Sequence, residues 1–380
     1  MNNAIKLFKI RGIDIKMHFT FPLILIWAGL SFGVFQNGGL EGAAYGVLVT
    51  SLVFLIVLLH ELGHSIAAQY YQVPVRQIIL LPIGGVAQLE EIPEDPKKEL
   101  VIAVAGPLVN LLLAIILVLI APMVGQTFSA NRLLSLTEIL GELSFSSIFL
   151  YVFITNLFIG VFNLIPAYPM DGGRILRAFL ATQLTYTRAT AVAVTIGQIL
   201  SWGFGLWGFL NGNFFLIILA FFIYSGAAQE GRMVQTKHVL GDLRVEQAYS
   251  RGVRSISLNE PLETALQATL NSFQSSFPIC DEGHLAGMLP YSTLVRALEK
   301  KDIQTPIRDV MQTGIEPVSP RDSLIEVQKR MSLEKVDALP VVDEMQGFLG
   351  MITSQDLNEA YRLSLALDKA EPTLRVQEAL

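Results

Sequence analysis

The sequence has 380 residues, of which 52% are hydrophobic and only 16% are charged, whereas a soluble globular chain carries about 25% charged residues; an ordinary soluble enzyme is therefore excluded. Charged residues number 23 among residues 1–230 and 37 among the last 150, which is typical of a membrane domain followed by a soluble domain. The net charge is −6 without a dominant basic cluster, so no nucleic-acid partner is expected, and the single cysteine, Cys280, excludes an intramolecular disulfide and a multi-cysteine zinc site.

Five runs without Asp, Glu, Lys or Arg predict the membrane spans. A bilayer core of about 30 Å needs about 20 apolar residues of helix, so four of these runs predict one span each. The fifth run contains Asn211-Gly212-Asn213, which favours a turn and therefore predicts two helices. The first run is too long for the apolar core of a signal peptide, so we expect it to be retained. Six spans are predicted in total, from the runs 17–40, 42–60, 100–131, 143–170 and 189–229.

The positively charged residues near the spans predict the orientation. With a cytoplasmic N-terminus, ten Lys and Arg residues fall in cytoplasmic segments and only Arg132 falls in an external loop, as the positive-inside rule requires. An even number of spans returns the chain to the cytoplasm. We therefore expect a multi-pass protein of the cell membrane whose N-terminus and soluble half are cytoplasmic.

One apolar segment, residues 77–89, is too short to cross the bilayer. Pro82, Gly84 and Gly85 interrupt it and disfavour a helix. Non-helical backbone at membrane depth is tolerated only against protein or a wet cavity. The segment is therefore predicted to be a short re-entrant element that lines such a cavity.

The second span ends in His60-Glu61-Leu62-Gly63-His64. Residues i and i+4 share one face of a helix, so both imidazoles can bind one metal, and Glu61 stands next to the water that such a metal activates. The alternative is that the two histidines are hydrogen-bonded packing residues. Because a Glu and two His within an apolar span are energetically expensive, they indicate a functional site, and the spacing is typical of a zinc hydrolase.

A third ligand must come from elsewhere, since catalytic zinc usually has three protein ligands and an open position. The other three histidines lie at the start of the first span or in the soluble half, so an acid is favoured. Asp171 follows the fourth span, which runs in the same direction as the second and so brings it to the depth of His60 and His64. Asp171 could alternatively be an ordinary juxtamembrane acid, or the cap of a helix that begins at Arg174.

Together these residues resemble the paired signature of the site-2 protease family of intramembrane zinc metalloproteases, over about residues 17–230. The matching segments are His60-Glu61-x-x-His64, Asn163-x-x-Pro166-x-x-Pro169-x-Asp171-Gly172, Ala105-Gly106-Pro107-x-x-Asn110 and the Gly84-Gly85 segment.

The resemblance implies one zinc ion bound by His60, His64 and Asp171, with Glu61 as the catalytic base. It also implies that Asn163 positions the substrate backbone. The segment at Gly84 and Gly85 would offer a strand edge to an unwound substrate. The implied partner is a single-span protein of the lipid bilayer, such as a membrane-anchored regulator that cleavage releases. Asn163 and Asn110 could instead be ordinary helix–helix hydrogen-bonding residues, and Asn110 is interpreted as mainly structural.

The soluble half contains an internal repeat with an offset of 62 residues. The matched pairs include Ile256 with Val318, Leu262 with Leu324, Pro278 with Pro340, Ile279 with Val341 and Asp281 with Asp343. Each copy alternates amphipathic helices with short apolar strands and buries little alone, so the copies should pack together. The region 243–365 resembles a tandem pair of cystathionine-β-synthase (CBS) domains. The resemblance implies adenine-nucleotide binding, and a homodimer through this module is a possible assembly.

The nucleotide-binding pattern of that family is complete only in the second copy, at Thr353 and Asp356. The first copy has Pro290 and Thr293 at the matching positions. Thr353 and Asp356 also fit a helix N-cap, so a purely structural or dimerising role remains the alternative. Our hypothesis is that the module senses a ligand and gates the protease through the linker 231–242.

The expected fold is thus a polytopic α-helical membrane bundle of six helices with a short re-entrant β element, followed by a cytoplasmic α/β tandem CBS module. The expected segments are 1–230 for the protease domain, 231–242 for the linker, 243–302 and 303–365 for the CBS domains, and 366–380 for the tail.

Two rival functions use the same residues. A CBS-regulated transporter or channel could use the His, Glu and Asp cluster as an ion site, but a pathway should place charges in several spans, and here they converge on one point. A pseudoprotease that binds zinc without cleaving is the second rival, although the expected catalytic groups are all present.

Overall fold

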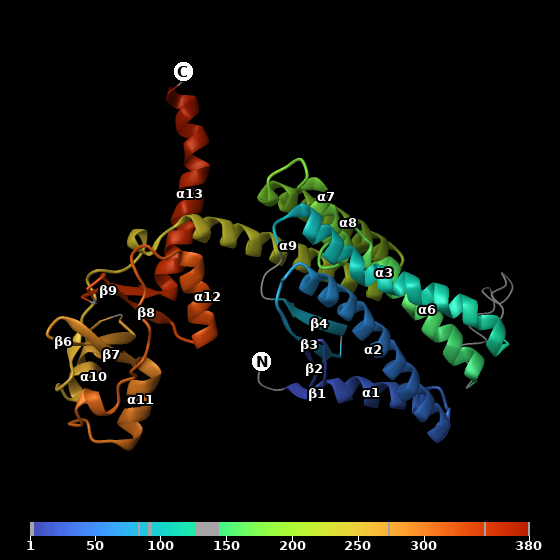
Figure 1. Cartoon of the computed structure of the whole chain (residues 1–380), viewed down its shortest axis with the longest axis horizontal. Helices are drawn as coiled ribbons and strands as arrows, with labels where there is room; N and C mark the ends of the chain where they lie inside the picture. Colours follow the sequence, from blue (N-terminus) through green and yellow to red (C-terminus); the bar gives the residue numbers. More distant parts are fainter. Residues whose placement is uncertain are drawn as a thin grey trace. The chain divides into compact units, whose positions relative to one another are not determined.

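The computed structural model describes residues 4–82, 84–89, 93–125, 144–272, 274–345 and 347–378. They form two compact units, Met1–Arg232 and Met233–Leu380, which are drawn in Figure 1 from blue through yellow and from yellow to red.

The first unit is mainly helical. Its helices are α1 (Phe21–Leu30), continued by the π-helix η1 (Ser31–Phe35), α2 (Gly39–Tyr70), α3 (Pro96–Ile120), continued by the 3-10 helix η2 (Ala121–Val124), α6 (Phe145–Asn163), α7 (Asp171–Leu180), α8 (Tyr186–Leu210) and α9 (Phe214–Asp242). Within the described ranges, five helices are long and apolar enough to cross a membrane: α2, α3 with η2, α6, α8 and α9. The predicted division of the fifth run into two helices is confirmed, because the chain turns at Asn211–Asn213 between α8 and α9.

The prediction of six spans is not confirmed. The run 17–40 contains the end of a strand, the apolar helix Phe21–Phe35 and a turn in which Asn37 and Gly39 adopt positive φ. A helix of this length is shorter than the roughly 20 residues that a straight span needs. Counting uncharged residues overestimated the helix, because turn and strand residues are also uncharged. For the same reason the run 143–170 ends its helix at Asn163, before Pro166 and Pro169.

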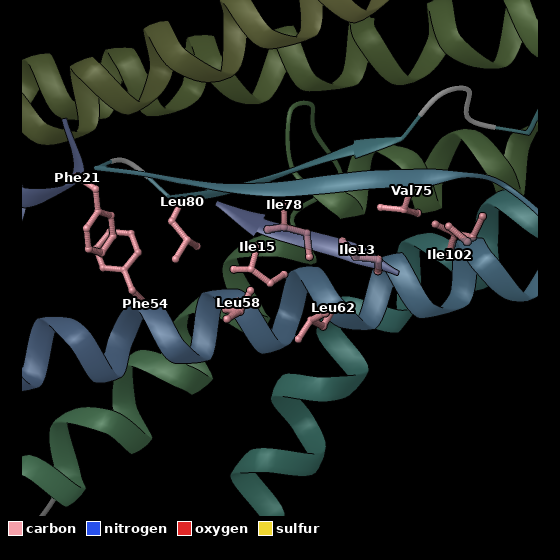
Figure 2. Packing of buried hydrophobic residues seen from close by; sticks show 11 residues of the cluster. Ile13, Ile15, Phe21, Phe54, Leu58, Leu62, Val75, Ile78, Leu80 and Ile102 are labelled. Carbon is pink, nitrogen blue, oxygen red and sulfur yellow. The ribbon is translucent and has the colours of Figure 1, made fainter. Parts of the chain in front are cut away.

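A four-stranded sheet packs beside α2. Its order is β1 (Ala4–Ile10), β2 (Ile13–His18), β3 (Val75–Leu81) and β4 (Gly84–Leu89). The central pair β2–β3 is parallel and the outer pairs are antiparallel. Ile13, Ile15 and Ile78 are fully buried, because alternate strand residues point toward the helix. Figure 2 shows them facing Leu58 and Leu62 of α2.

The predicted re-entrant element is the hairpin β3–β4 of this sheet. Antiparallel pairing runs from Val75 opposite Leu89 to Leu81 opposite Gly84. The hairpin partners β2 through β3 and contacts α2. Within the described sheet, β3 is therefore paired along both edges and β4 along one edge. Its position at membrane depth stays a prediction.

The second unit contains two similar halves. The first has the sheet β5 (Ile256–Ser257), β6 (Ser276–Asp281) and β7 (His284–Pro290) with helices α10 (Leu262–Asn271) and α11 (Tyr291–Lys300). The second has β8 (Ala338–Val342) and β9 (Phe348–Thr353) with α12 (Leu324–Glu334) and α13 (Ser354–Glu378).

The register of these strands matches the predicted repeat. Ile256 pairs in parallel with Ile279, and Val318 pairs in parallel with Val341. In each copy the first segment therefore pairs with the hairpin of the same copy, and the two pairs are offset by 62 residues in the sequence. Each copy has its own hydrophobic core. The segment predicted as the linker 231–242 is not irregular, because it is the last part of α9.

Candidate metal and catalytic centre

Two neighbouring elements place the three predicted metal ligands. His60 and His64 lie one turn apart on α2 and are 4% and 6% exposed. Asp171 is the first residue of α7 and is 8% exposed, where a carboxylate is stabilised by the free backbone N–H groups of a helix start. Asp171 is thus neither the end of a span nor the cap of a helix starting at Arg174.

The ligand atoms of these residues form a nearly equilateral triangle. His60 Nε2 is 3.1 Å from His64 Nε2, His64 Nε2 is 3.1 Å from Asp171 Oδ2, and His60 Nε2 is 3.2 Å from Asp171 Oδ2. Tetrahedral ligands bound at about 2.0–2.1 Å lie about 3.3 Å apart. The triangle therefore fits a zinc ion with a fourth position open.

The hydrogen bonds of the imidazoles support the same interpretation. His60 Nδ1 donates to Asn110 Oδ1 at 2.5 Å, and His64 Nδ1 donates to the carbonyl oxygen of Ile102 at 2.7 Å. Both acceptors lack hydrogens, so each neutral ring carries its proton on Nδ1 and presents a lone pair at Nε2. Two lone pairs and a carboxylate oxygen at these distances repel one another unless a cation binds between them.

Asn110 contacts the predicted ligand His60 and also makes the helix–helix hydrogen bonds expected of a structural residue. Its amide Nδ2 donates to Asn156 Oδ1 at 2.9 Å, and Asn156 Nδ2 donates to the Asn110 carbonyl oxygen at 2.8 Å. Both asparagines are buried, at 2% and 0% exposure. This exchange between α3 and α6 fixes the amide so that its oxygen faces His60. Asn156 was not identified from the sequence, where it stands in an apolar run without a motif.

Gly106 leaves space beside the Nε2 side of both imidazoles. A Cβ atom at this position would clash with His64 Nε2 and would lie 2.8 Å from His60 Cε1. Such a methyl group would occupy the space into which the ligand atoms point. The glycine of the Ala105-Gly106-Pro107 segment is therefore required by the site rather than by the helix.

Glu61 and the predicted substrate-positioning residues share one cavity. This cavity has a volume of about 540 Å³, and its wall includes the three ligands, Glu61, Gly84, Gly85, Asn163 and Arg174. A Cβ atom at Gly85 would lie 2.8 Å from Glu61 Cγ, so β4 approaches the glutamate as closely as a side chain allows. Asn163 donates from Nδ2 to the carbonyl oxygen of Ile159 at 3.0 Å, which leaves Oδ1 and one amide hydrogen for another partner.

Comparisons with known proteins give the family of the chain. The model of peptidase family M50 matches residues 48–204, and the CBS-domain model matches residues 245–300 and 307–363. The zinc metalloprotease MJ0392 of Methanocaldococcus jannaschii is 33% identical over 361 residues, which cover 95% of this chain and 96% of that protein. The chain belongs to peptidase family M50. The predicted combination of a site-2 protease domain and a CBS pair is confirmed.

This M50 protein also matches two further relatives over most of their length. Rip3 of Mycobacterium tuberculosis, a putative zinc metalloprotease, is 25% identical over 394 residues, which cover 98% of this chain and 96% of Rip3. The solved structure of a site-2 protease from Methanocaldococcus jannaschii is 40% identical and covers 60% of this chain and 95% of that chain, with a TM-score of 0.44.

A buried ion cluster lies behind the metal ligands of the M50 domain. Arg177, on the same helix as Asp171, is fully buried and donates from Nε to Glu99 Oε1 at 2.8 Å and from Nη1 to Glu230 Oε1 at 2.7 Å. Its guanidinium also lies over the rings of Tyr168 and Tyr186, at 5.4 and 4.7 Å. The cluster ties α7 to α3 and α9, and thereby fixes the helix that carries the predicted third ligand, Asp171.

In the second CBS copy, Thr353 and Asp356 bind each other. Asp356 Oδ2 accepts hydrogen bonds from the backbone N–H and the hydroxyl of Thr353, at 2.8 and 2.7 Å, and the Thr353 hydroxyl accepts one from the Asp356 N–H at 3.1 Å. Asp356 Oδ1 accepts from Ser250 at 2.9 Å. This is the predicted N-cap arrangement at the start of α13; it leaves the nucleotide-binding role of both residues a prediction.

Proposed function

We propose that this M50 protein hydrolyses a peptide bond in or near the transmembrane segment of a single-span membrane protein. The observation that carries the proposal is the convergence of His60, His64 and Asp171 on one point in the wall of the cavity that also contains Glu61. Its wall is built partly by α2, α6 and α9, which are three of the candidate membrane spans, so the cavity lies among helices that would face a substrate in the bilayer.

The chain's own residues supply the ligands, the base and the positioning. Bound zinc would polarise the scissile carbonyl and lower the pKa of a water molecule. Glu61 takes a proton from the attacking water as the new C–O bond forms, and returns it to the leaving nitrogen as the C–N bond breaks. Asn163 has Oδ1 free for a backbone N–H of the substrate.

The strand β4 is the proposed docking edge for the substrate. In the described part of the chain it pairs with β3 alone, and Gly84 and Gly85 lie in the cavity wall. An extended substrate can hydrogen-bond to this edge, which gives affinity without a sequence requirement. A transmembrane helix satisfies its own backbone groups, so the substrate must unwind, and helix-breaking residues near the cleavage site should favour cleavage.

The orientation and the regulation are part of the same proposal. The excess of Lys and Arg on one side supports a cytoplasmic CBS module. A cytoplasmic N-terminus is part of the proposal only with Phe21–Phe35 as a sixth crossing, because the five longer helices alone would place the two ends on opposite sides. We propose that the CBS pair modulates cleavage, with an adenine nucleotide bound near Thr353 and Asp356, and that it can hold two copies of the chain together as a homodimer.

The test is cleavage of a tagged single-span substrate in reconstituted membranes. Glu61→Gln should retain one zinc ion per chain and lose cleavage by a factor of about 10² or more, because the ligands stay but the base is lost. Glu41→Gln makes the same change at an exposed position on the same helix and should cleave at the wild-type rate.

Other outcomes separate the rival functions. Zinc bound without cleavage by the wild type, across several substrates, would favour a pseudoprotease. If the wild type binds no zinc, the metalloprotease proposal fails, and ion flux through the same membranes becomes the next measurement.

A further inference from the structure

The N-terminal β-hairpin, residues 4–18, is an exposed surface at the edge of the sheet. We call it the basic hairpin; it comprises β1, β2 and the turn at Arg11-Gly12. Its outer strand β1 is the first in the sheet order and pairs with β2. Ile5, Leu7 and Phe8 are 61%, 45% and 46% exposed. Large apolar side chains that are exposed together indicate a surface that another molecule or lipid covers.

The two faces of the basic hairpin differ in chemistry. Residues paired directly across an antiparallel ladder share a face. Phe8 pairs with Ile15, which is fully buried, and Ile5 pairs with Met17. Ile5 and Phe8 therefore extend the apolar face of the sheet beyond the part that α2 covers.

The opposite face carries the charges. Lys6 pairs with Lys16 and Lys9 pairs with Asp14, so three ammonium groups and one carboxylate share this face. Lys6 Nζ is 2.6 Å from Asp14 Oδ1. The hydrogen bond from Lys6, with the charges of Lys9 and Lys16, holds the pKa of Asp14 below its usual value. Asp14 is the sole acid among residues 1–40. Three lysines share one carboxylate, and Lys6 directly opposite Lys16 is a repulsive pair.

The apolar face continues onto surface that lipid would cover. β2 ends at His18 and the apolar helix α1 begins at Phe21. Phe19 is 58% exposed, and Leu23 and Trp27 on α1 are 61% and 59% exposed. Exposed aliphatic and aromatic side chains beside clustered lysines are typical of a segment that lies in the interface of an anionic membrane.

We propose that the basic hairpin binds the surface of the bilayer, with Ile5 and Phe8 entering the boundary between headgroups and acyl chains and with Lys6, Lys9 and Lys16 binding phosphates of anionic phospholipids. The proposal does not depend on proteolysis. It does have a consequence for the site, because the other edge of the same sheet places Gly85 against Glu61. Four strands therefore join the lipid contact to the catalytic cavity and fix the depth of the cavity in the membrane.

The experiment uses the full chain in nanodiscs, with Cys280→Ser and Leu7→Cys carrying an environment-sensitive dye. Nanodiscs of phosphatidylcholine alone are compared with nanodiscs that also contain phosphatidylglycerol, each with and without nitroxide-labelled lipid. We expect strong quenching in the anionic membrane and weak quenching in the neutral one, with the difference reduced by salt. Each lysine removed should weaken binding about fivefold.

Variants separate charge from folding. Lys9→Gln, which keeps the Lys6–Asp14 pair, should reduce quenching in the anionic membrane, and Lys6→Gln/Lys9→Gln/Lys16→Gln should reduce it to the neutral level. Lys300→Gln/Lys301→Gln/Lys335→Gln removes the same charge from the second unit and should change nothing. Absence of quenching in both membranes would overturn the proposal, and equal quenching in both would overturn the binding of anionic phosphates.

Discussion

At the residue scale, the predicted metal ligand His60 is oriented by an asparagine. Asn110 Oδ1 accepts the Nδ1 proton of His60 and so fixes the tautomer that offers Nε2 to the metal. Asn110→Leu removes this acceptor, and we expect zinc affinity to fall about 10- to 100-fold. Asn110→Asp keeps an acceptor and should bind zinc more tightly than Asn110→Leu. Competition with a chelator measures both, and equal affinities of Asn110→Leu and the wild type would refute this role.

Gly106 gives a second prediction at this scale. The Cβ atom of Gly106→Ala would overlap His64 Nε2, so the purified variant should contain little zinc and cleave little substrate. Gly203→Ala is the matched control, because a Cβ atom there meets nothing within 4 Å; it should retain both. Helical content from circular dichroism should be the same in the two variants. Stoichiometric zinc in Gly106→Ala would contradict the prediction.

The sequence predicts the relative positions of residues on one helix, but it does not predict contacts between different helices. His60 and His64 were placed correctly because one helix sets their spacing. Asp171 lies 107 and 111 positions away from His64 and His60 in the sequence. Its place beside them therefore follows only from the expected direction of the spans. The contacts of Asn110 and Asn156 depend on how α3 packs against α6. No periodicity in either helix indicates which polar side chain faces the other.

At the scale of elements, Arg177 holds α7 in place. Arg177→Met would leave the buried carboxylate of Glu99 and the partly buried carboxylate of Glu230 without their cation, so the free energy of unfolding should fall by about 3–5 kcal/mol. The midpoint of thermal unfolding in detergent measures this. Adding Glu99→Gln and Glu230→Gln should recover part of the loss, because fewer unpaired charges remain. Arg188→Met, at an exposed position of α8, should be close to neutral; an equally small effect of Arg177→Met would contradict a stabilising role.

Composition predicts where apolar segments lie but not where their helices begin and end. Charge-free runs locate apolar surface, and five of the predicted spans contain helices long enough to cross. They do not locate helix ends: backbone geometry at Asn37 and Gly39, and prolines at 166 and 169, end helices within uncharged sequence. Only the β3–β4 part of the sheet could be predicted. The hairpin of β1, β2 and their turn contains four Lys and Arg residues, and its sequence therefore resembles the basic segment before a signal peptide or first span.

At the scale of the whole molecule, the two CBS copies exchange backbone pairing: a residue from the first segment of each copy pairs with the hairpin of the other copy. Ser250, in the first segment of the first copy, pairs with Met351 on β9. Gln312, in the first segment of the second copy, pairs with Met288 on β7. The two pairs are related by offsets of 62 and 63 residues, the latter after the one-residue slip between the copies. Ser250 and Gln312 also donate to the matched side chains Asp356 and Thr293. Only the second copy has a carboxylate at this point.

This asymmetry predicts how a nucleotide would bind. We expect a ribose hydroxyl that donates to Asp356 Oδ1 to compete there with the hydroxyl of Ser250, while Thr353 continues to hold Oδ2. A net hydrogen bond contributes about 1 kcal/mol, so Ser250→Ala, which frees Oδ1 in advance, should bind ATP about fivefold more tightly than the wild type. Asp356→Asn should bind it more weakly, and Thr293→Val, in the first copy, should bind it normally.

Calorimetric titration of the full chain with ATP distinguishes these outcomes from the capping role alone. If Asp356 serves only as the N-cap of α13, Asp356→Asn will lower the midpoint of thermal unfolding and ATP will bind none of the variants. If ATP binds but Ser250→Ala weakens it, Ser250 is itself a ligand-binding group and the competition is wrong. Tighter binding by Ser250→Ala would place the nucleotide where the segment that follows α9 contacts the second copy. Nucleotide binding and the position of that segment would then depend on each other.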